Sequence, residues 1–159
     1  MSIKKIKLLI LDLDGVITDG TVIISDENNE YKKFSYQDLD AITVLHKLGL
    51  EIAILTAEDT HIASLIAKRF NIKNLVLGAK NKEAALIELA KRLKISLSNI
   101  CYLADGDRDA PALEMVGVGL APENGTKKAK NSSMKTLKSS GGNGAIKEAV
   151  DFLYEKNLI

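Results

Sequence analysis

The sequence predicts an α/β fold in which a parallel sheet is covered by helices on both faces. Short apolar stretches alternate along the chain with amphipathic stretches of helical period. The loops that join them are short, as in repeated strand–helix units. The chain has 159 residues, of which 46% are hydrophobic, and neither a low-complexity linker nor an internal repeat divides it. We therefore expect one domain that spans residues 1–159.

The first part of the chain contains a strand, a hairpin and a helix. An apolar run over residues 8–11 predicts a buried strand. Two β-rich segments, 21–25 and 30–34, flank a polar turn and predict a hairpin. A stripe of apolar residues predicts a helix over 38–48, which Gly49 ends.

The rest of the chain repeats the strand–helix alternation. Apolar runs predict strands over 51–56, 74–77, 99–104 and 118–121, and an edge strand over 134–137. Helical periodicity predicts helices over 60–70, 81–93 and 145–156, a short helix through 112–115 and a basic helical turn over 127–131. Asn81 has the side chain of a helix N-cap, and residues 139–144 are a Ser/Gly loop before the closing helix.

The composition argues against several classes of function. A net charge of +1 gives no pull toward nucleic acid or an anionic membrane, and 4% aromatic residues without tryptophan provide no stacking surface for bases. No apolar run approaches the ~20 residues of a membrane helix, and residues 1–5 lead into a strand rather than a signal peptide. The only cysteine, Cys101, lies in an apolar run, where a thiol is ordinarily inert, and it has no second cysteine with which to form an internal disulfide. We therefore expect a reducing, cytoplasmic location.

Two aspartates follow the first strand at its C-terminal end. Asp12 and Asp14 are two positions apart, so their side chains point to the same side of an extended backbone. Two carboxylates held side by side in a buried setting need a cation or a shared proton. Gly15 allows a sharp turn and a close approach of the backbone to a ligand. The pattern favours a divalent metal with a phosphate nearby, and its structural alternative is an ordinary polar Asp-Gly turn.

Further polar side chains are expected at the same edge of the sheet. Thr56 ends the second sheet strand, and Asp105 and Asp109 follow the fourth. Lys80 and Lys82 lie at the beginning of the helix after the third strand. Ligands of an open parallel sheet bind beyond the carboxyl ends of its strands. Carboxylates, a hydroxyl and an amine together suit an anionic substrate and a hard metal ion.

Residues 12–20 resemble motif I of the haloacid dehalogenase-like phosphatase superfamily; they read DLDGVITDG. More narrowly, they resemble the 3-deoxy-D-manno-octulosonate 8-phosphate (KDO 8-phosphate) phosphatases and their relatives. Residues 140–148, SGGNGAIKE, resemble the glycine-rich tail signature of that branch. The resemblance covers essentially the whole chain. It implies a Rossmannoid sheet in which the hairpin at about 21–34 stands in place of a cap domain.

The resemblance also implies a role for each polar residue at the sheet edge. Asp12 matches the nucleophile that forms an aspartyl phosphate, and Asp14 matches the general acid and base. Thr56 and Lys82 match the groups that bind the phosphate. The implied cofactor is Mg²⁺, with Asp12, Asp14, Asp105 and Asp109 as its ligands. The implied activity is that of a phosphomonoesterase acting on a sugar acid phosphate, most specifically KDO 8-phosphate.

The chain departs from the branch at motif II. The branch usually has Thr-Gly-Arg or Ser-Gly-Arg, where this chain has Thr56, Ala57 and Glu58. An arginine that pairs with the sugar carboxylate is thus replaced by an acid, and we expect Arg69 to supply the missing positive charge. Glu58 and Arg69 are therefore the predicted substrate-binding pair. Relatives that act on sialic-type nine-carbon 9-phosphates can carry Glu here, so that substrate is the alternative.

Two other classes of function are compatible with parts of this sequence. A non-catalytic oligomerisation module, like the C-terminal domain of acylneuraminate cytidylyltransferases, is the first alternative. It would not need the residues implied for catalysis, and this chain keeps them: Asp12, Asp14, Thr56, Lys82 and Asp105. A signalling receiver domain has its phosphoacceptor after the third strand, where this chain has Leu77 and Gly78. Neither a P-loop nor a dinucleotide-binding glycine motif is present in the sequence.

The remaining polar residues are expected to have structural roles. Lys80 is expected in solvent, and Asp107 as the N-cap of the following helix. His46 and His61 lack the spacing of a metal site and are expected on the surface.

The hairpin predicts an oligomer. It is too small to cover a cleft, and its Val22, Ile23 and Ile24 need burial that a lone ribbon cannot provide. We expect a homotetramer in which neighbouring subunits complete each active site around a slender sugar phosphate.

Overall fold

The computed structural model describes residues 4–159 and contains one parallel sheet. Residues 1–5 were expected to lead into a strand rather than to form a signal peptide, and residues 1–3 of that segment lie outside the described residues. The six strands of the sheet are β1 (Leu8–Leu11), β4 (Glu51–Leu55), β5 (Asn74–Val76), β6 (Ile100–Leu103), β7 (Val118–Ala121) and β8 (Lys135–Thr136). Their order is β5-β4-β1-β6-β7-β8, and every neighbouring pair is parallel. This arrangement confirms the predicted fold class.

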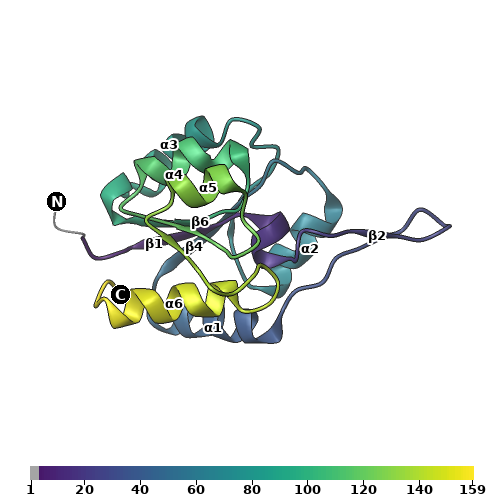
Figure 1. Ribbon diagram of the computed structural model, residues 1–159, viewed down its shortest axis with the longest axis horizontal. Helices are drawn as coiled ribbons and strands as arrows, with labels where there is room; N and C mark the ends of the chain where they lie inside the picture. Colours follow the sequence, from purple (N-terminus) through teal and green to yellow (C-terminus); the bar gives the residue numbers. More distant parts are fainter. Residues whose placement is uncertain (1–3) are drawn as a thin grey trace.

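Helices cover both faces of the sheet (Figure 1). One layer consists of α1 (Tyr36–Lys47), α2 (His61–Arg69) and α6 (Ala145–Glu155), and the other of α3 (Lys82–Leu93), α4 (Ala110–Met115) and α5 (Lys127–Ser132). The two layers enclose separate hydrophobic cores, because successive side chains of a strand point to opposite faces. In β1, Leu9 and Leu11 belong to one core, and Leu8 and Ile10 to the other.

β1 is the central strand on which the site is built. It pairs with β4 on one side and β6 on the other, and its four side chains are fully buried. A strand buried on both faces has a continuous apolar sequence, which is why residues 8–11 were recognisable. The predicted helices and sheet strands agree with the observed ones to within two residues at each end.

β1 is followed by a tight coil, and the sequence analysis did not predict this coil. This segment, η1 (Leu13–Ile17), contains Gly15 in a left-handed conformation with φ +81°. A Cβ atom at Gly15 would collide with the carboxylate of Asp105. Only glycine therefore allows this loop and the end of β6 to approach each other.

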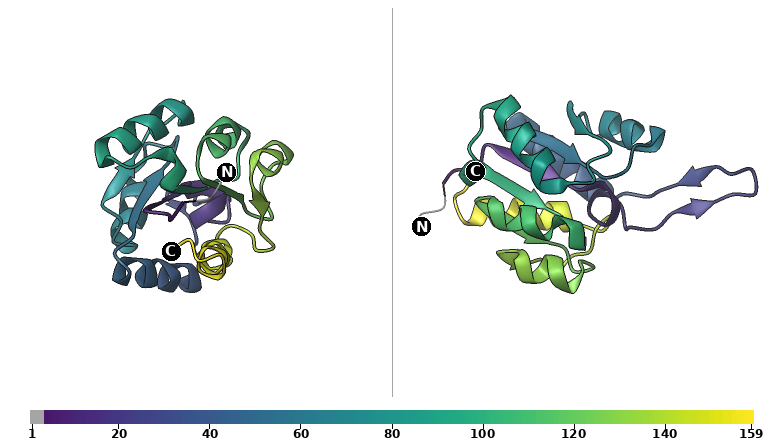
Figure 2. Two further views of the ribbon diagram at one scale, coloured as in Figure 1. Left: turned by 90° about the vertical axis from the view of Figure 1, so that its left-hand side faces the viewer. Right: turned by 90° about the horizontal axis from the view of Figure 1, so that it is seen from above.

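The predicted hairpin extends away from the body of the molecule (Figure 2). Its paired strands, β2 (Ile23–Ile24) and β3 (Glu30–Tyr31), are shorter than the β-rich segments from which it was inferred. Ile23 is 68% exposed and Ile24 is 60% exposed, so apolar side chains on both faces of the ribbon have no cover within one chain. Among residues 4–159, none of the helices combines the length and apolarity that crossing a membrane requires.

Candidate active site

The C-terminal ends of the central strands surround a cleft of about 410 Å³. Asp12 follows β1 and Thr56 follows β4, and the helix α3 brings in Lys82 at its first residue. The loop between β6 and α4 contributes Asp109 to the lining. The cleft therefore lies where an open parallel sheet is expected to bind its ligand.

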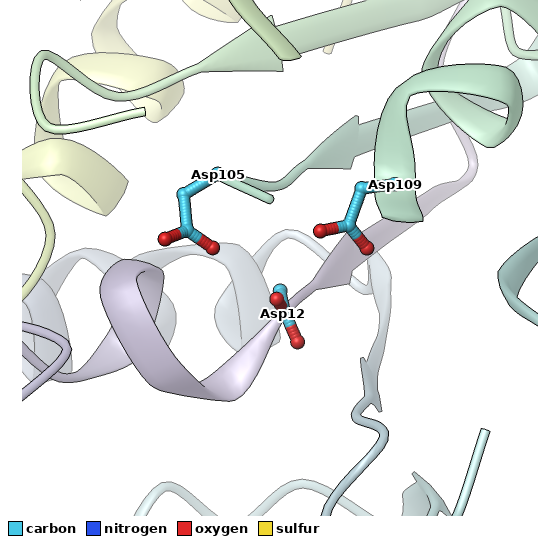
Figure 3. Close-up of side chains that lie close together, drawn as sticks. All are labelled: Asp12, Asp105 and Asp109. Atoms are coloured by element: carbon cyan, nitrogen blue, oxygen red, sulfur yellow. The ribbon is translucent and has the colours of Figure 1, made fainter. Parts of the chain in front are cut away.

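Three carboxylates meet at this edge (Figure 3). One oxygen each of Asp12, Asp105 and Asp109 lies within 4.8 Å of the others. Burial raises the pKa of Asp12 to about 7, with the Lys82 ammonium opposing this rise and the two other carboxylates adding to it. Burial and the neighbouring Asp109 raise the pKa of Asp105 to about 6. The negative charge of the cluster is thus incompletely compensated by the protein.

Lys82 is the cation that contacts this cluster. Its ammonium lies 3.0 Å from Asp12 Oδ1, 2.9 Å from Asp109 Oδ1 and 3.0 Å from the Leu55 carbonyl oxygen. The residue is 4% exposed. The Asp12 and Asp109 carboxylates raise its pKa, against the effect of burial itself. Three acceptors engage all three N–H donors of the ammonium, which fixes its position at the floor of the cleft.

Asp109 is held by donors that the sequence analysis missed. The buried Tyr102 hydroxyl donates to Asp109 Oδ1 at 2.5 Å, and the Gly106 N–H donates to Oδ2 at 3.0 Å. Burial and the adjacent Asp109 raise the pKa of Tyr102. Successive residues of a strand point to opposite faces, so Tyr102, two residues before Ala104 on β6, lies on the face that α3 covers. This alternation is the sequence signal that could have identified Tyr102.

The prediction that Asp107 is a helix N-cap is wrong. Gly106 precedes the short helical turn Asp107–Asp109, and the exposed Asp107 lines the cleft instead.

Asp14 lines the cleft but is absent from the carboxylate cluster. Its carboxylate forms an ion pair with Lys32, a residue of the hairpin stem that the sequence analysis did not single out. The Thr18 hydroxyl donates to Asp14 Oδ1 at 3.3 Å. Of the four predicted metal ligands, the structure therefore brings together three, and a metal role for Asp14 stays a prediction.

The predicted substrate-binding residues are separated. Glu58 lies exposed at the cleft, beside the buried Thr56, whose Oγ1 accepts a hydrogen bond from the Glu58 N–H at 3.1 Å. Arg69 lies at the end of α2, where it donates to the Tyr36 hydroxyl at 3.1 Å, and it does not line the cleft. The cleft contains a different arginine, Arg108, which is exposed and comes from the loop after β6.

The glycine-rich tail supports motif I of its own chain. Asn124 donates to the Gly15 carbonyl oxygen at 3.0 Å and accepts from the Gly141 N–H at 2.7 Å. The Gly142 N–H donates to the Val16 carbonyl oxygen at 3.0 Å. A side chain at Gly141 would overlap the backbone of Gly15, so this loop packs directly under the motif I turn.

The remaining predicted residues lie away from the acids. Lys80 and His61 are exposed, as expected. His46 is half-buried rather than on the surface, because its Nε2 lies 3.2 Å from the Phe70 carbonyl oxygen and holds α1 against the end of α2. Cys101 is buried, and burial raises the pKa of its thiol.

The chain is similar to a known family and to named relatives. Residues 74–149 match the model of the haloacid dehalogenase-like hydrolases. The 3-deoxy-D-manno-octulosonate 8-phosphate phosphatase of Escherichia coli K12 is 30% identical over 150 residues, which cover 94% of this chain and 80% of that protein. The enzyme of the same name from Haemophilus influenzae is 29% identical over 153 residues, covering 96% and 85%.

Solved structures of such phosphatases have the same fold as this chain. The enzyme from Moraxella catarrhalis, in complex with magnesium, phosphate and KDO, is 32% identical with a TM-score of 0.90; the match covers 94% of this chain and 86% of that one. The cobalt-bound enzyme from Haemophilus influenzae is 29% identical with a TM-score of 0.89, covering 95% and 88%.

Proposed function

This chain belongs to the KDO 8-phosphate phosphatase branch of the haloacid dehalogenase-like hydrolases, and on that premise we propose that it hydrolyses KDO 8-phosphate to KDO and phosphate with the help of Mg²⁺. The observation that carries the proposal is the buried Asp12 at the end of β1, which contacts Lys82 and faces Asp105 and Asp109. The named relatives favour the eight-carbon substrate over a nine-carbon 9-phosphate.

The residues present fit a magnesium ion. Asp12, Asp105 and Asp109 offer hard oxygen ligands within 4.8 Å of one another, and the raised pKa values of Asp12 and Asp105 reflect negative charge that lacks a counter-ion. These three residues would hold the ion. When bound, it neutralises charge on the phosphoryl oxygens and so allows an anionic nucleophile to approach.

Asp12 is oriented for attack on phosphorus. Its Oδ1 accepts hydrogen bonds from the Leu13 N–H at 2.8 Å and from Lys82 at 3.0 Å, which leaves Oδ2 as the nucleophilic oxygen. Oδ2 forms a bond to phosphorus while the bond from phosphorus to the sugar oxygen breaks. Asp14 gives its proton to the departing alcohol. Water then attacks the aspartyl phosphate, Asp14 takes the proton, and the bond between Oδ2 and phosphorus breaks.

Thr56 and Lys82 support the phosphoryl group. Thr56 lines the cleft at the end of β4 and keeps its hydroxyl hydrogen available, since its Oγ1 acts as an acceptor toward Glu58. Lys82 contributes a fixed positive charge at the floor. Catalysis of phosphoryl transfer depends mostly on such positioning and charge neutralisation.

The proposal is tested by measuring phosphate release from KDO 8-phosphate, a sialic-type 9-phosphate and p-nitrophenyl phosphate, each with and without Mg²⁺. We expect turnover of KDO 8-phosphate that requires Mg²⁺, no turnover by Asp12→Asn, and a loss of about 10²–10⁴-fold in Asp14→Asn. Wild-type activity in Asp12→Asn would contradict the covalent mechanism. A purified wild-type chain that releases phosphate from none of the three esters would instead support the non-catalytic module.

We also propose a homotetramer whose subunits complete one another's active sites. The exposed Ile23, Ile24 and Tyr31 of the hairpin support an interface, because a two-stranded ribbon does not bury such residues by itself. Light scattering checks the assembly: a monomer at micromolar concentration with full activity would contradict it.

We further propose a cytoplasmic location, in keeping with the single buried thiol.

A further inference from the structure

Lys32 is a buried lysine on a ribbon that is otherwise in solvent. Its side chain is 7% exposed, whereas that of the adjacent Lys33 is 77% exposed. The two point to opposite sides because side chains alternate along an extended segment. A buried ammonium requires a partner of opposite charge, so the burial of Lys32 points to a specific contact.

That partner is the Asp14 carboxylate. The Lys32 ammonium lies 2.8 Å from Asp14 Oδ1 and 2.9 Å from Oδ2. The other hydrogen bond to this carboxylate among residues 4–159 is the longer one from Thr18, at 3.3 Å. Asp14 lines the cleft and Lys32 does not, so the lysine supports the carboxylate from behind.

The hairpin stem is attached to motif I close to this ion pair. A β-bridge joins Thr18 to Phe34, two residues after Lys32. Lys33 forms its own ion pair with Asp19 at 3.0 Å. The Lys33 side chain is 77% exposed, so this pair contributes little, and the backbone bridge is the contact that sets the path of the stem and delivers Lys32 to Asp14.

We propose that Lys32 is a positioning residue that holds the Asp14 carboxylate in the orientation required for proton transfer. The inference rests on the proposed function, in which Asp14 protonates the leaving alcohol. Without Lys32, the carboxylate keeps one long hydrogen bond and rotates about its side-chain torsions. A displacement of about 1 Å at a reacting group reduces the rate by about 10²-fold. Through Lys32 alone, the hairpin stem thereby supports the proton-transfer group, in addition to its place in the proposed subunit interface.

The test compares two leaving groups in Lys32→Met. An alkoxide leaves poorly without a proton, whereas p-nitrophenolate leaves readily as an anion. We measure kcat/KM for KDO 8-phosphate and for p-nitrophenyl phosphate, since this parameter reports the steps up to departure of the first product. The ratio of the two values is expected to fall by about 10–100-fold in Lys32→Met, within the range of general acid catalysis. Because both values come from one preparation, the ratio does not depend on the folded fraction.

Two variants complete the test. Lys33→Met removes the same charge from the neighbouring position and should leave the ratio unchanged, and Lys32→Arg should recover most of it. An unchanged ratio in Lys32→Met, or an equal fall in Lys33→Met, would overturn the inference. Failure of the proposed function is recognised separately, because the wild-type chain would then release no phosphate from KDO 8-phosphate.

Discussion

Removing the ammonium of Lys82 should destabilise the folded protein in a pH-dependent way. Lys82→Met keeps most of the side-chain volume but leaves Asp12 and Asp109 without the cation that lies 3.0 and 2.9 Å from them. Breaking a buried ion pair by removing one partner costs about 3–5 kcal/mol. For a chain of this size, that loss lowers the melting temperature by roughly 6–20 °C.

The pH dependence follows from the carboxylate that Lys82 contacts. The pKa of Asp12 is already raised to about 7, and it rises further once the ammonium is gone. At pH 8 the variant must either keep the Asp12 carboxylate charged without its cation or bind a proton from the solvent, and both cost free energy; at pH 5 Asp12 is protonated with or without Lys82, so it adds little to the penalty. The loss of stability should therefore be larger at pH 8 than at pH 5, where the lost contact with Asp109 still contributes.

Thermal unfolding with a chelator present measures this effect without interference from bound metal. Lys80→Met is the matched control, since Lys80 is exposed and two residues away, and its effect should stay within about 0.5 kcal/mol. A loss of equal size at both pH values, or none at pH 8, would refute the electrostatic reasoning.

Three further predictions follow from the site. In the metal-free wild type, folding raises the pKa of Asp12 to about 7 and that of Asp105 to about 6, from the ordinary value of 3.8. Between pH 5 and pH 8 the folded protein therefore binds more protons than the unfolded one. Its melting temperature should therefore fall as the pH rises from 5 to 8, and Mg²⁺ should reverse the trend, because the metal binds the deprotonated carboxylates. Arg108 lines the cleft, and we expect it to bind the carboxylate of the sugar acid. Arg108→Leu should therefore lower kcat/KM for KDO 8-phosphate by about tenfold, as expected for one lost charge-assisted hydrogen bond, and leave p-nitrophenyl phosphate hydrolysis within about twofold; equal losses on both would argue against this carboxylate recognition. Glu58→Arg should change the relative kcat/KM of eight- and nine-carbon substrates, and a uniform loss on all substrates would mean that Glu58 is structural.

The sequence by itself determined the fold class and the floor of the site. Continuous apolar runs identified β1 and its neighbours because strands buried on both faces need apolar residues throughout. The rule that ligands bind beyond the carboxyl ends of parallel strands then brought Asp12, Thr56, Lys82 and Asp105 to one edge. These inferences depend on strand period and chain order, which are local properties of the sequence.

Only the tertiary structure decided which side chains contact the carboxylates of the candidate site. Lys32 comes from a hairpin whose path is set by its attachment to Thr18, and Tyr102 reaches Asp109 across the buried face of β6. Likewise, Arg69 is held by Tyr36 while Arg108 lines the cleft. Periodicity says which face a residue occupies, but the direction of a long side chain from a loop or helix end depends on contacts between segments distant in the sequence.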